Sequence, residues 1–272
     1  MSVTSNGAAA GLASHDLTGA DQNLPLVSII TSVLNGAATL EKALASVAAQ
    51  TYPRIEYLVI DAASTDGTPE ILARHGDQLA YWVSEPDAGI YDAWNKGLRQ
   101  ARGQWVMFLG ADDQLPPDAV AALVAAAQAR GEGLDFVMGQ VALYRGATHL
   151  RTIGRPWDWR LFRKYMSIAH TGGLHAMAYF QRHGLFDPSY RIAGDYELLL
   201  RAGPGLRTLF VPVVVAEMQV GGASNRSTAV FHEWQRAKDL HGVQPAWLNA
   251  WDARWAMIKW RLKRWLNLGG GA

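Results

Sequence analysis

The chain has 272 residues, of which 49% are hydrophobic and 18% are charged. This length fits one large domain, or one domain with an appendage, and the apolar content is sufficient for a buried core. Because the sequence contains no cysteine, disulfide scaffolds, thiolate metal sites and cysteine nucleophiles are excluded, and any metal must bind oxygen or imidazole.

The net charge of +1 hides an uneven distribution along the chain. From Asn225 onward there are eight basic and three acidic residues, which leaves 17 basic and 21 acidic residues, a net charge of −4, in residues 1–224. Six of the eleven tryptophans also lie in this final part. We therefore expect a disordered leader (1–24), a main domain (25–224) and a basic, tryptophan-rich helical tail (225–272).

The leader shows no sign of targeting. Residues 1–24 are rich in serine, glycine and alanine, and they lack the basic start and apolar core of a secretory signal peptide. No apolar run in the chain reaches the roughly 18 residues that a membrane-spanning helix needs. We therefore expect a cytoplasmic protein without a transmembrane span.

From residue 25 onward, short apolar runs alternate with segments of helical periodicity. Strands are predicted over residues 26–31, 55–60, 79–84 and 104–109, and helices over residues 39–50, 68–75 and 89–102. This alternation is typical of a doubly wound α/β sheet, in which ligands bind beyond the carboxyl ends of the strands. Functional side chains should therefore follow the strands.

Polar and acidic residues do follow all four predicted strands. The segments are SVLNG (32–36), DAASTDGT (61–68), SEPDAG (84–89) and GADD (110–113). The same residue types also favour turns for local reasons. Acids at three of the four ends, in a chain with fewer than one acid in ten residues, favour a binding site over this alternative.

Asp112 and Asp113 are adjacent carboxylates directly after an apolar strand. They would repel each other unless a cation lay beside them, and Mg²⁺ or Mn²⁺ suits such oxygen ligands. Mg²⁺ commonly takes one or two carboxylates together with substrate phosphates, so a nucleotide diphosphate is the natural companion. The alternative is a helix N-cap at Asp113 or Gln114, before Pro116 and Pro117.

Asp195 lies in the segment IAGDYELLLR, where it opens an apolar helical run over residues 196–200. One interpretation is a helix cap. The other is a general base, because a single carboxylate beside Gly194, far along the chain from the other acids, suits projection into a cleft.

Together these segments resemble the family 2 inverting glycosyltransferases of the GT-A fold, particularly bacterial enzymes that build cell-surface polysaccharides. The resemblance covers residues 27–224 and is carried by five segments in order, VSIITSVLNGAATLEKALASVAAQTY, IEYLVIDAASTDGT, SEPDAGIYDAWNKGLRQARGQWVMFLGADD, GLFDPSYRIAGDYELLLR and VGGAS. It implies a single Rossmann-like α/β sheet, mixed but mostly parallel and flanked by helices, with the tail as a C-terminal helical extension.

The resemblance also implies roles for individual residues. Asp112 and Asp113 match the DXD element, with Asp113 as the metal ligand and Asp112 nearer the ribose, and Asp195 matches the catalytic base. The other implied donor-site residues are Ser32, Asn35, Asp61, Asp92 and Lys96, with a solvated helix face as the alternative for Lys96. On the helix after Gly89, the spacing places Asp92, Asn95 and Lys96 on one face and a buried side at Tyr91, Trp94 and Leu98.

Two positions depart from the family pattern. Ala111 stands where a third acidic residue is common, so metal binding rests on fewer ligands. His170 is followed by Thr171 where the family often has a glutamine. His170 and His175 remain candidates for contact with the acceptor, with a purely structural role as the alternative.

The spacing of apolar residues in the tail predicts an amphipathic helix from residue 245. Its apolar stripe consists of Trp247, Leu248, Trp251, Trp255, Ile258, Leu262, Trp265 and Leu266, and the rest of its surface holds Trp260 and the basic residues Arg254, Lys259, Arg261, Lys263 and Arg264. Tryptophans and cations in this arrangement are typical of a helix that lies on an anionic membrane. We therefore predict peripheral binding of residues 246–267 to the inner face of the plasma membrane, with packing on the sheet or a partner subunit as the alternative.

These observations predict transfer of a sugar from a nucleotide-sugar to a hydroxyl of a saccharide or polyprenyl-linked acceptor in polysaccharide, O-antigen or capsule assembly. The resemblance favours a UDP-sugar, with GDP and dTDP as alternatives, and Mn²⁺ or Mg²⁺ as the cofactor. A metal-dependent nucleotidyltransferase and a non-catalytic sugar-nucleotide-binding subunit are the other classes.

Several further classes are disfavoured. The sequence has no GxGxxG or GxxxxGK[ST] motif, which argues against a Rossmann dinucleotide site and a P-loop ATPase. The acidic body and the lack of a recognised module argue against nucleic-acid binding. Oligomerisation stays open.

Overall fold

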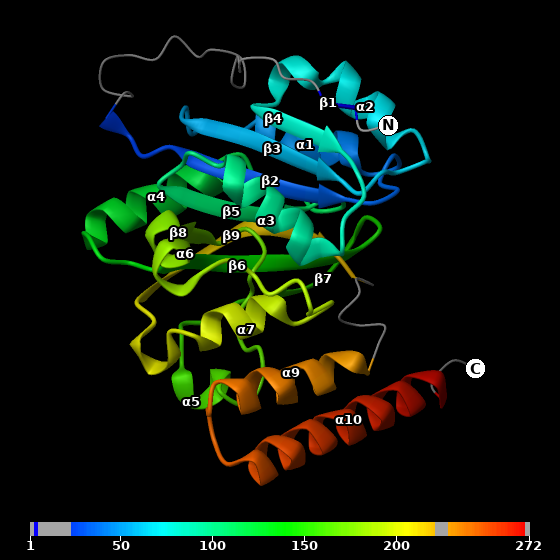
Figure 1. Ribbon diagram of the computed structural model, residues 1–272, viewed down its shortest axis with the longest axis vertical. Coiled ribbons are helices and arrows are strands. Elements are labelled where there is room, and N and C mark those ends of the chain that lie inside the picture. Colours follow the sequence, from blue (N-terminus) through cyan, green and yellow to red (C-terminus); the bar gives the residue numbers. More distant parts are fainter. Residues whose placement is uncertain (1–2, 5–22, 221–227, 270–272) are drawn as a thin grey trace.

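A mixed β-sheet lies at the centre of the protein in the computed structural model, which describes residues 3–4, 23–220 and 228–269 (Figure 1). Within the described residues, nine strands form this sheet in the spatial order β1-β4-β3-β2-β5-β8-β6-β7, and β9 pairs with β6. The strands are β1 (Val3–Thr4), β2 (Val27–Val33), β3 (Ile55–Asp61), β4 (Tyr81–Ser84), β5 (Trp105–Gly110), β6 (Phe136–Arg145), β7 (Thr148–Ile153), β8 (Leu174–Ala176) and β9 (Thr208–Gln219).

The strands β2 to β5 run parallel to one another, whereas the short β1 is antiparallel to β4. β2 pairs with β3 and β5, and β3 pairs with β4. β8 is antiparallel to both β5 and β6, whereas the long β9 is parallel to β6. The expected mixed, mostly parallel sheet is therefore confirmed.

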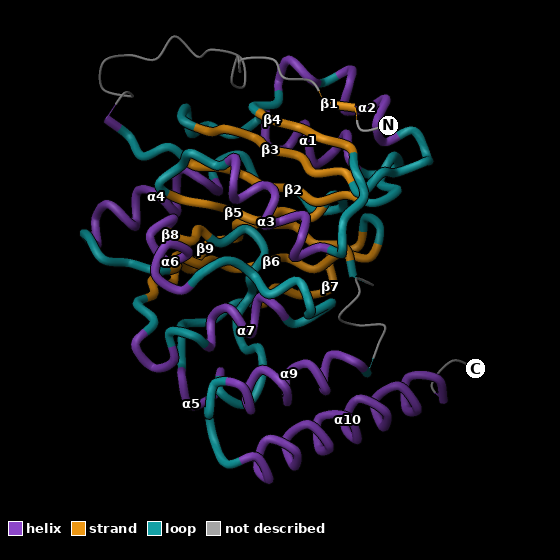
Figure 2. Tube along the Cα trace, viewed as in Figure 1, coloured by secondary structure: helices purple, strands orange, loops and turns teal. Residues whose placement is uncertain are grey.

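Helices cover the sheet on both sides (Figure 2). They are α1 (Leu40–Ala48), α2 (Thr68–Arg74), α3 (Ile90–Gln100), α4 (Ala119–Arg130), α5 (Trp159–Phe162), α6 (Met177–His183), α7 (Gly194–Leu200), α9 (Ala229–Leu240) and α10 (Ala246–Gly269). The four strands and three helices predicted from periodicity correspond to β2 to β5 and α1 to α3, and each of their ends lies within two residues of the expectation.

Both faces of the central strands are buried, because successive side chains of a strand point to opposite faces. In β2, Val27, Ile29 and Val33 belong to one apolar layer and Ile30 to the other. The first layer is closed by α1, α2 and α4, and the second by α3, α6, α7 and α9. This double packing gives the sheet a rigid edge on which loops can present functional groups.

The tail forms two helices, α9 and α10, that lie side by side beyond α7 (Figures 1 and 2). α9 packs on α7, and α10 packs on α9 through a side that contains the buried Ala253 and the partly buried Met257 and Trp260. None of the described helices is both long and apolar enough to cross a lipid bilayer.

Parts of the expected organisation lie outside the described residues. Val3 and Thr4 pair with Ser84 and Val83, but residues 1–2 and 5–22 of the predicted leader are not described. The same is true of residues 221–227, which contain most of the VGGAS segment, and of the side chains of Trp265 and Leu266.

Candidate active site

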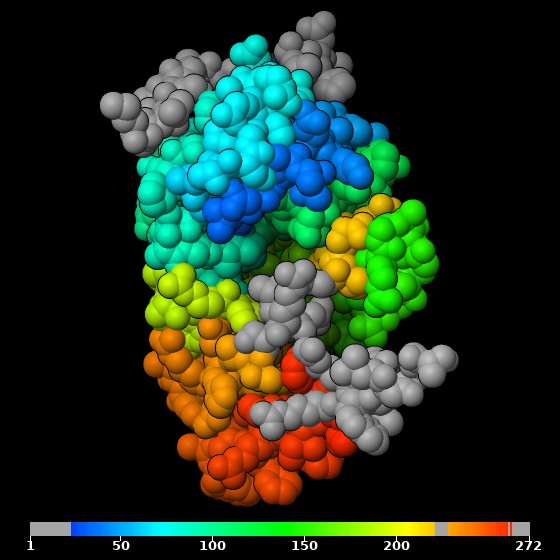
Figure 3. Space-filling view, turned by 90° about the vertical axis from the view of Figure 1, so that its right-hand side faces the viewer, coloured from blue at the N-terminus to red at the C-terminus, as the bar shows by residue number. Residues whose placement is uncertain are grey.

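The predicted donor-side positions begin at one edge of the sheet. The parallel register places Ser32 opposite Gly110 and Val33 opposite Asp61, so the carboxyl ends of β2, β3 and β5 lie level. The loops that follow these strands therefore face the same side of the molecule. Figure 3 looks onto that side, which is hollowed below the residues coloured blue and cyan.

Asp61 is fully buried at the end of β3 and joins two of these loops. Its Oδ2 accepts hydrogen bonds from the backbone N–H of Ser64 at 3.0 Å and from the Ser84 hydroxyl at 2.5 Å, and its Oδ1 accepts one from the Ser64 hydroxyl. The Ser64 hydroxyl also accepts the N–H of Asn35 at 2.7 Å. A buried carboxylate needs hydrogen-bond donors, and these contacts hold the loops in place.

Backbone strain is concentrated in the same two loops. Asn35 and Ala63 have φ angles of 52° and 56°, and they are the only non-glycine residues with positive φ among those described. Oδ1 of Asn35 accepts the N–H of Thr65 at 3.0 Å, which ties the two loops together a second time. Left-handed backbone at a residue with a side chain costs energy and is often found at functional sites.

Asp112 and Asp113 follow β5 in contrasting environments. Asp112 is exposed, whereas Asp113 is only 5% exposed. The pKa of Asp113 is raised to about 7, mainly by burial and then by the charge of Asp112, while backbone hydrogen bonds from Gly110 and Gln219 oppose the rise. Ionised Asp113 therefore lacks a compensating positive charge.

The space beside this pair suits a small cation. A Cβ on Gly110 would lie 2.7 Å from Oδ2 of Asp113 and 3.0 Å from Oδ1 of Asp112, so carboxylate oxygens from both residues border the same position. No group of three or more acidic, histidine or cysteine side chains that could hold a metal exists among the described residues. This donor set fits Mg²⁺ or Mn²⁺ that completes its coordination with phosphate and water.

The helix-cap alternative for Asp113 is wrong. α4 begins at Ala119, and Asp118 occupies its N-cap position. The turn that carries Asp113 is instead fastened to β9, because Gln114 and Glu217 exchange backbone hydrogen bonds of 3.0 and 2.8 Å.

Asp195 lies in the first turn of α7, one residue after the position at which the helix begins. Its Oδ1 accepts the N–H of Tyr196 at 2.8 Å and lies 3.3 Å from the Tyr91 hydroxyl, which also contacts the carbonyl oxygen of Ile192 at 2.7 Å. Its Oδ2 has no hydrogen-bond partner in the described part of the chain. The N-cap position belongs to Ala193, so Asp195 does not cap α7 in the way the local alternative required.

Close packing explains the glycine before Asp195. A Cβ at Gly194 would lie 2.8 Å from ring carbons of Tyr91, which is closer than such atoms approach. Burial raises the pKa of Tyr91 well above its ordinary value, and the charge of Asp195 acts in the same direction. Tyr91 is therefore a neutral phenol that holds one oxygen of Asp195.

The predicted buried side of α3 is confirmed, since Tyr91, Trp94 and Leu98 are all buried. Asn95 is buried as well and exchanges two hydrogen bonds with the backbone of Phe186, at 2.8 and 3.0 Å, so it does not share an open face with its neighbours.

Asp92 and Lys96 both hold the loop that precedes α3. Oδ2 of Asp92 accepts the N–H of Ala88 at 3.0 Å. Nζ of Lys96 lies 2.8 Å from the carbonyl oxygen of Pro86 and 2.8 Å from Oε1 of Glu85.

His170 and His175 form a buried pair, with their Nε2 atoms 3.0 Å apart. His170 lies roughly parallel to the rings of Trp94 and Phe108, which contact each other, and the fully buried His175 stacks on Phe136. Burial lowers the pKa of both imidazoles, and the charge of Asp195 partly offsets this at His170. His170 therefore lies within the electrostatic range of Asp195.

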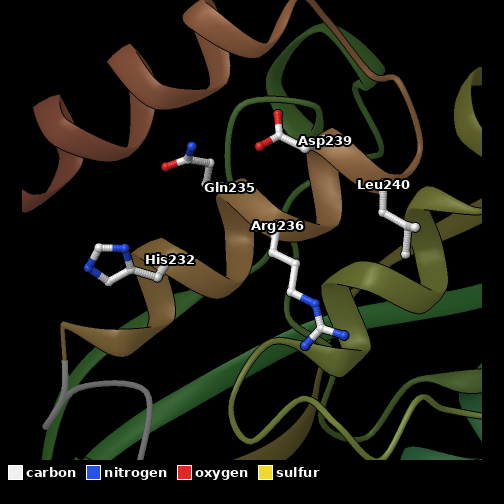
Figure 4. A pocket seen from close by; sticks show the side chains of 5 residues that line it. All are labelled: His232, Gln235, Arg236, Asp239 and Leu240. Atoms are coloured by element: carbon white, nitrogen blue, oxygen red, sulfur yellow. The ribbon is translucent and has the colours of Figure 1, made fainter.

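A separate hollow of about 530 Å³ lies along α9 (Figure 4). Its five lining side chains all come from that helix, and none of them is a predicted site residue; they are His232, Gln235, Arg236, Asp239 and Leu240. The hollow is open to solvent and is not part of the strand-end site.

The sequence did not reveal the partners that hold the aspartates. Ser64 stands three residues after Asp61, a spacing typical of local side-chain to backbone hydrogen bonds, so this contact had a weak signal. Ser84 and Tyr91 reach Asp61 and Asp195 only through the fold, and no local pattern marks them.

Comparison with known proteins adds an independent observation. Residues 28–189 match the family model described as Glycosyl transferase family 2, a range that contains Asp61, Asp112 and Asp113 and ends before Asp195. A glycosyltransferase of Mycobacterium tuberculosis is 32% identical over 236 residues, which cover 81% of this chain and 86% of the relative. A PGL/p-HBAD biosynthesis glycosyltransferase of Mycobacterium bovis is 35% identical over 208 residues, covering 74% and 80% of the two chains.

Solved structures resemble the fold. S. aureus TarS 1–349 in complex with UDP-GlcNAc gives a TM-score of 0.67 at 17% identity and covers 80% of this chain, which spans 66%, just under two thirds, of that one. The mannosyltransferase PcManGT from Pyrobaculum calidifontis, in complex with GDP-Man and Mn²⁺, gives 0.60 at 22% identity and covers 93% and 77% of the two chains. These likenesses identify the GT-A fold.

Proposed function

Because the chain belongs to glycosyl transferase family 2, we propose that this glycosyltransferase is an inverting enzyme in which Asp195 is the general base. The donor is a nucleotide-sugar, and the acceptor is a hydroxyl of a saccharide, carried on a polyprenyl lipid during polysaccharide, O-antigen or capsule assembly. Family membership argues against the nucleotidyltransferase and the non-catalytic subunit.

The donor occupies the edge formed by the ends of β2, β3 and β5. UDP is the first choice for its nucleotide, because TarS is solved with UDP-GlcNAc, although the mannosyltransferase carries GDP-Man. Asp61 and Asn35 shape the nucleotide pocket through the strained loops they hold together, and Ser32 lies at the same level of the sheet. Asp92 and Lys96 keep the loop before α3 in position next to the donor sugar and diphosphate.

Asp113 binds a divalent cation, Mn²⁺ or Mg²⁺, and Asp112 lies nearer the ribose. When bound, the cation supplies positive charge next to the diphosphate that leaves. The observation that supports this role is the buried, charge-uncompensated carboxylate of Asp113 beside the narrow space at Gly110.

The hydrogen bonding of the Asp195 carboxylate is the observation that supports its role as the base. Its Oδ1 is held by the N–H of Tyr196 beside the Tyr91 hydroxyl, while Oδ2 has no hydrogen-bond partner among the described residues and is the oxygen we assign to the acceptor hydroxyl. The acceptor oxygen attacks the anomeric carbon, its proton passes to Oδ2, and the bond to the diphosphate breaks with its electron pair on the leaving oxygen. Attack opposite the leaving group inverts the anomeric configuration.

The histidine pair and helix α10 are assigned to the acceptor side. His170, whose pKa the charge of Asp195 raises against the effect of burial, is the first candidate for contact with the acceptor, while His175 supports it from the core through the Nε2 pair. The exposed stripe of α10 supports our proposal that the enzyme binds an anionic membrane at the cytoplasmic face and takes a lipid-linked acceptor from it.

Replacement of Asp195 by asparagine tests the assignment. The change keeps the shape and the hydrogen bonds of Oδ1 but removes the proton acceptor, so nucleoside diphosphate release should fall by about 10²- to 10⁴-fold. UDP binding in the presence of Mn²⁺, measured by calorimetry, should be unchanged. The matched control is Asp187→Asn, which alters an acid that pairs with Arg236 of α9 instead. Turnover near the wild-type rate in Asp195→Asn would refute the assignment.

A further inference from the structure

The segment that precedes the proposed base is held by a carboxylate from the tail. Glu233 of α9 accepts three consecutive backbone N–H groups: Oε1 accepts that of Arg191 at 2.9 Å, and Oε2 accepts those of Ile192 at 2.9 Å and Ala193 at 2.8 Å. Ala193 is the residue directly before α7, and Asp195 lies in the first turn of that helix. The carboxylate therefore binds the backbone that leads into the base.

The same short segment is fixed from the other side. The hydroxyl of Tyr91 on α3 contacts the carbonyl oxygen of Ile192 at 2.7 Å and lies 3.3 Å from Oδ1 of Asp195. The guanidinium of Arg191 donates to the carbonyl oxygen of Ala88, whose own N–H is held by Asp92. Residues 191–195 thus lie between α9 and the loop on the donor side.

Among the side chains of this size, only a carboxylate satisfies the three donors fully. Three donors converge on two oxygens, and a carboxylate offers acceptor sites alone, whereas an amide would turn one N–H₂ group toward a backbone N–H. Negative charge also suits the entry to a helix, where the backbone N–H groups of the first turn carry partial positive charge.

We propose that Glu233 is a positioning residue for catalysis: it fixes residues 191–193 so that Oδ2 of Asp195 is directed at the acceptor hydroxyl. This inference rests on the proposed role of Asp195 as the base. Glu233 itself touches neither donor nor acceptor in this account. It lies outside residues 28–189, which match the family model, so the tail helix α9 completes the active site of this chain.

Contacts other than those of Glu233 also hold α9 in position. Phe231 and Ala237 are buried in the core, and Lys238 contacts Asp252 of α10 at 3.4 Å. His241, at the end of α9, lies 2.7 Å from Oε1 of Glu197 on α7. Removal of the Glu233 charge should therefore release the segment before α7 and leave the helix in place.

The test compares Glu233→Gln with Asp239→Asn in the full-length chain. Asp239 is an acid of the same helix that accepts a hydrogen bond from Asn249 of α10 and makes no contact with residues 191–193. Glu233→Gln should lower kcat by about 10- to 100-fold, the range expected when a catalytic group is misplaced by about an ångström. The KM for the nucleotide-sugar and UDP affinity with Mn²⁺ should stay within about twofold, because donor binding does not use this contact.

Two further readouts separate positioning from stability. Hydrogen exchange of the amides of residues 191–193 should become faster in Glu233→Gln, and the melting temperature should change by no more than about 5 °C. Asp239→Asn should keep the wild-type kcat and the wild-type exchange at these amides.

Two results in Glu233→Gln would count against the proposal. A kcat within about twofold of wild type in Glu233→Gln would overturn it, and so would a parallel fall in kcat, UDP affinity and melting temperature, which would make Glu233 a structural residue. Asp195→Asn is measured alongside to keep the two claims apart. If Asp195→Asn is inactive and Glu233→Gln is not, only the positioning role fails; if Asp195→Asn stays active, the assignment of the base fails first.

Discussion

Three aspartates of the site differ in what their surroundings leave free. Asp61 is enclosed by the serines that donate to it, so its role is to hold loops. Asp113 is buried without a compensating positive charge, and its pKa is raised to about 7. Asp195 has one oxygen anchored and one without a partner among the described residues. One residue type thus has three different environments, and these support the three roles proposed for it.

Replacement of Asp113 by asparagine should abolish the effect of the cation on donor binding. Calorimetry of UDP binding with and without Mn²⁺ should show an affinity gain in the wild type that disappears in Asp113→Asn. The loss should exceed about 10-fold, since even outer-shell partners of a metal are worth about 10- to 100-fold in affinity.

Asp118→Asn is the matched control for this experiment. Asp118 is an exposed acid in the same turn region, and its Oδ1 accepts the Thr51 hydroxyl at 2.8 Å. An Mn²⁺ effect of wild-type size in Asp113→Asn would show that the cation, if one binds, uses other ligands.

The buried histidine pair predicts how stability depends on pH. Burial, and then the neighbouring His170, lower the pKa of His175 well below its ordinary value of 6.5. Below about pH 6.5, His175 becomes protonated in the unfolded chain but stays neutral in the folded protein. The contribution of neutral, buried His175 to the free energy of unfolding is therefore fully present above about pH 6.5 and is lost as the pH falls. The loss reaches at most about 1.4 kcal/mol per pH unit for one group.

His175→Gln should reduce this slope, because glutamine keeps a donor toward His170 and does not titrate. The measurement is the free energy of unfolding in urea at about pH 7.5 and about pH 5.5. Equal losses between these pH values in the variant and the wild type would contradict a neutral, buried His175.

At the scale of elements, α10 has an apolar stripe that the described part of the chain leaves uncovered. Trp247 is 71% exposed and Trp251 65% exposed, and the stripe continues through Trp255, Ile258 and Leu262. Arg254 and Lys259 are exposed beside it, and Nζ of Lys259 lies 5.3 Å from the centre of the Trp255 ring. Exposed indoles with neighbouring cations complement an anionic lipid surface.

Replacement of Trp247, Trp251 and Trp255 by alanine should abolish binding to anionic membranes without unfolding the protein, because these side chains are exposed. Wild-type protein should sediment with vesicles of phosphatidylcholine and phosphatidylglycerol, and less with phosphatidylcholine alone. The control replaces Leu150 and Tyr165, exposed apolar residues elsewhere, by alanine.

Two outcomes would oppose the membrane role of α10. Wild-type protein that stays in the supernatant with anionic vesicles would refute it. A dimer in solution that the three tryptophan substitutions dissociate, without any vesicle binding, would identify the stripe as a contact between protein subunits.

Local periodicity predicted the elements of the first half and the stripe of α10 because both depend on neighbours in sequence. It predicted neither the strands β6 to β9 nor the position of Trp260. β6 pairs with β9 some 70 residues later, and such pairing leaves no local signal. Trp260, expected among the basic residues, packs near Phe231 because α10 docks on α9.

At the scale of the whole molecule, the acidic main domain carries the predicted donor site, and the basic tail lies at one end of the protein. The strand ends that carry Asp61, Asp112 and Asp113 open on one side, and α9 and α10 lie beyond α7 at one end (Figures 1 and 3). The aspartates were predictable because parallel strands bring their ends to one edge. The link from Glu233 to the segment before Asp195 was not, since it joins two distant segments that only the packing of α9 brings together.

The anomeric configuration of the first product tests the central claim most directly. A thermal-shift screen of UDP-, GDP- and dTDP-sugars with Mn²⁺ selects the donor, and proton NMR then follows the sugar that wild-type protein and Asp195→Asn release or transfer from it. The account predicts a product with inverted configuration, formed by the wild type and lost in Asp195→Asn. A product that retains the donor configuration, or equal turnover by the two proteins, would contradict it.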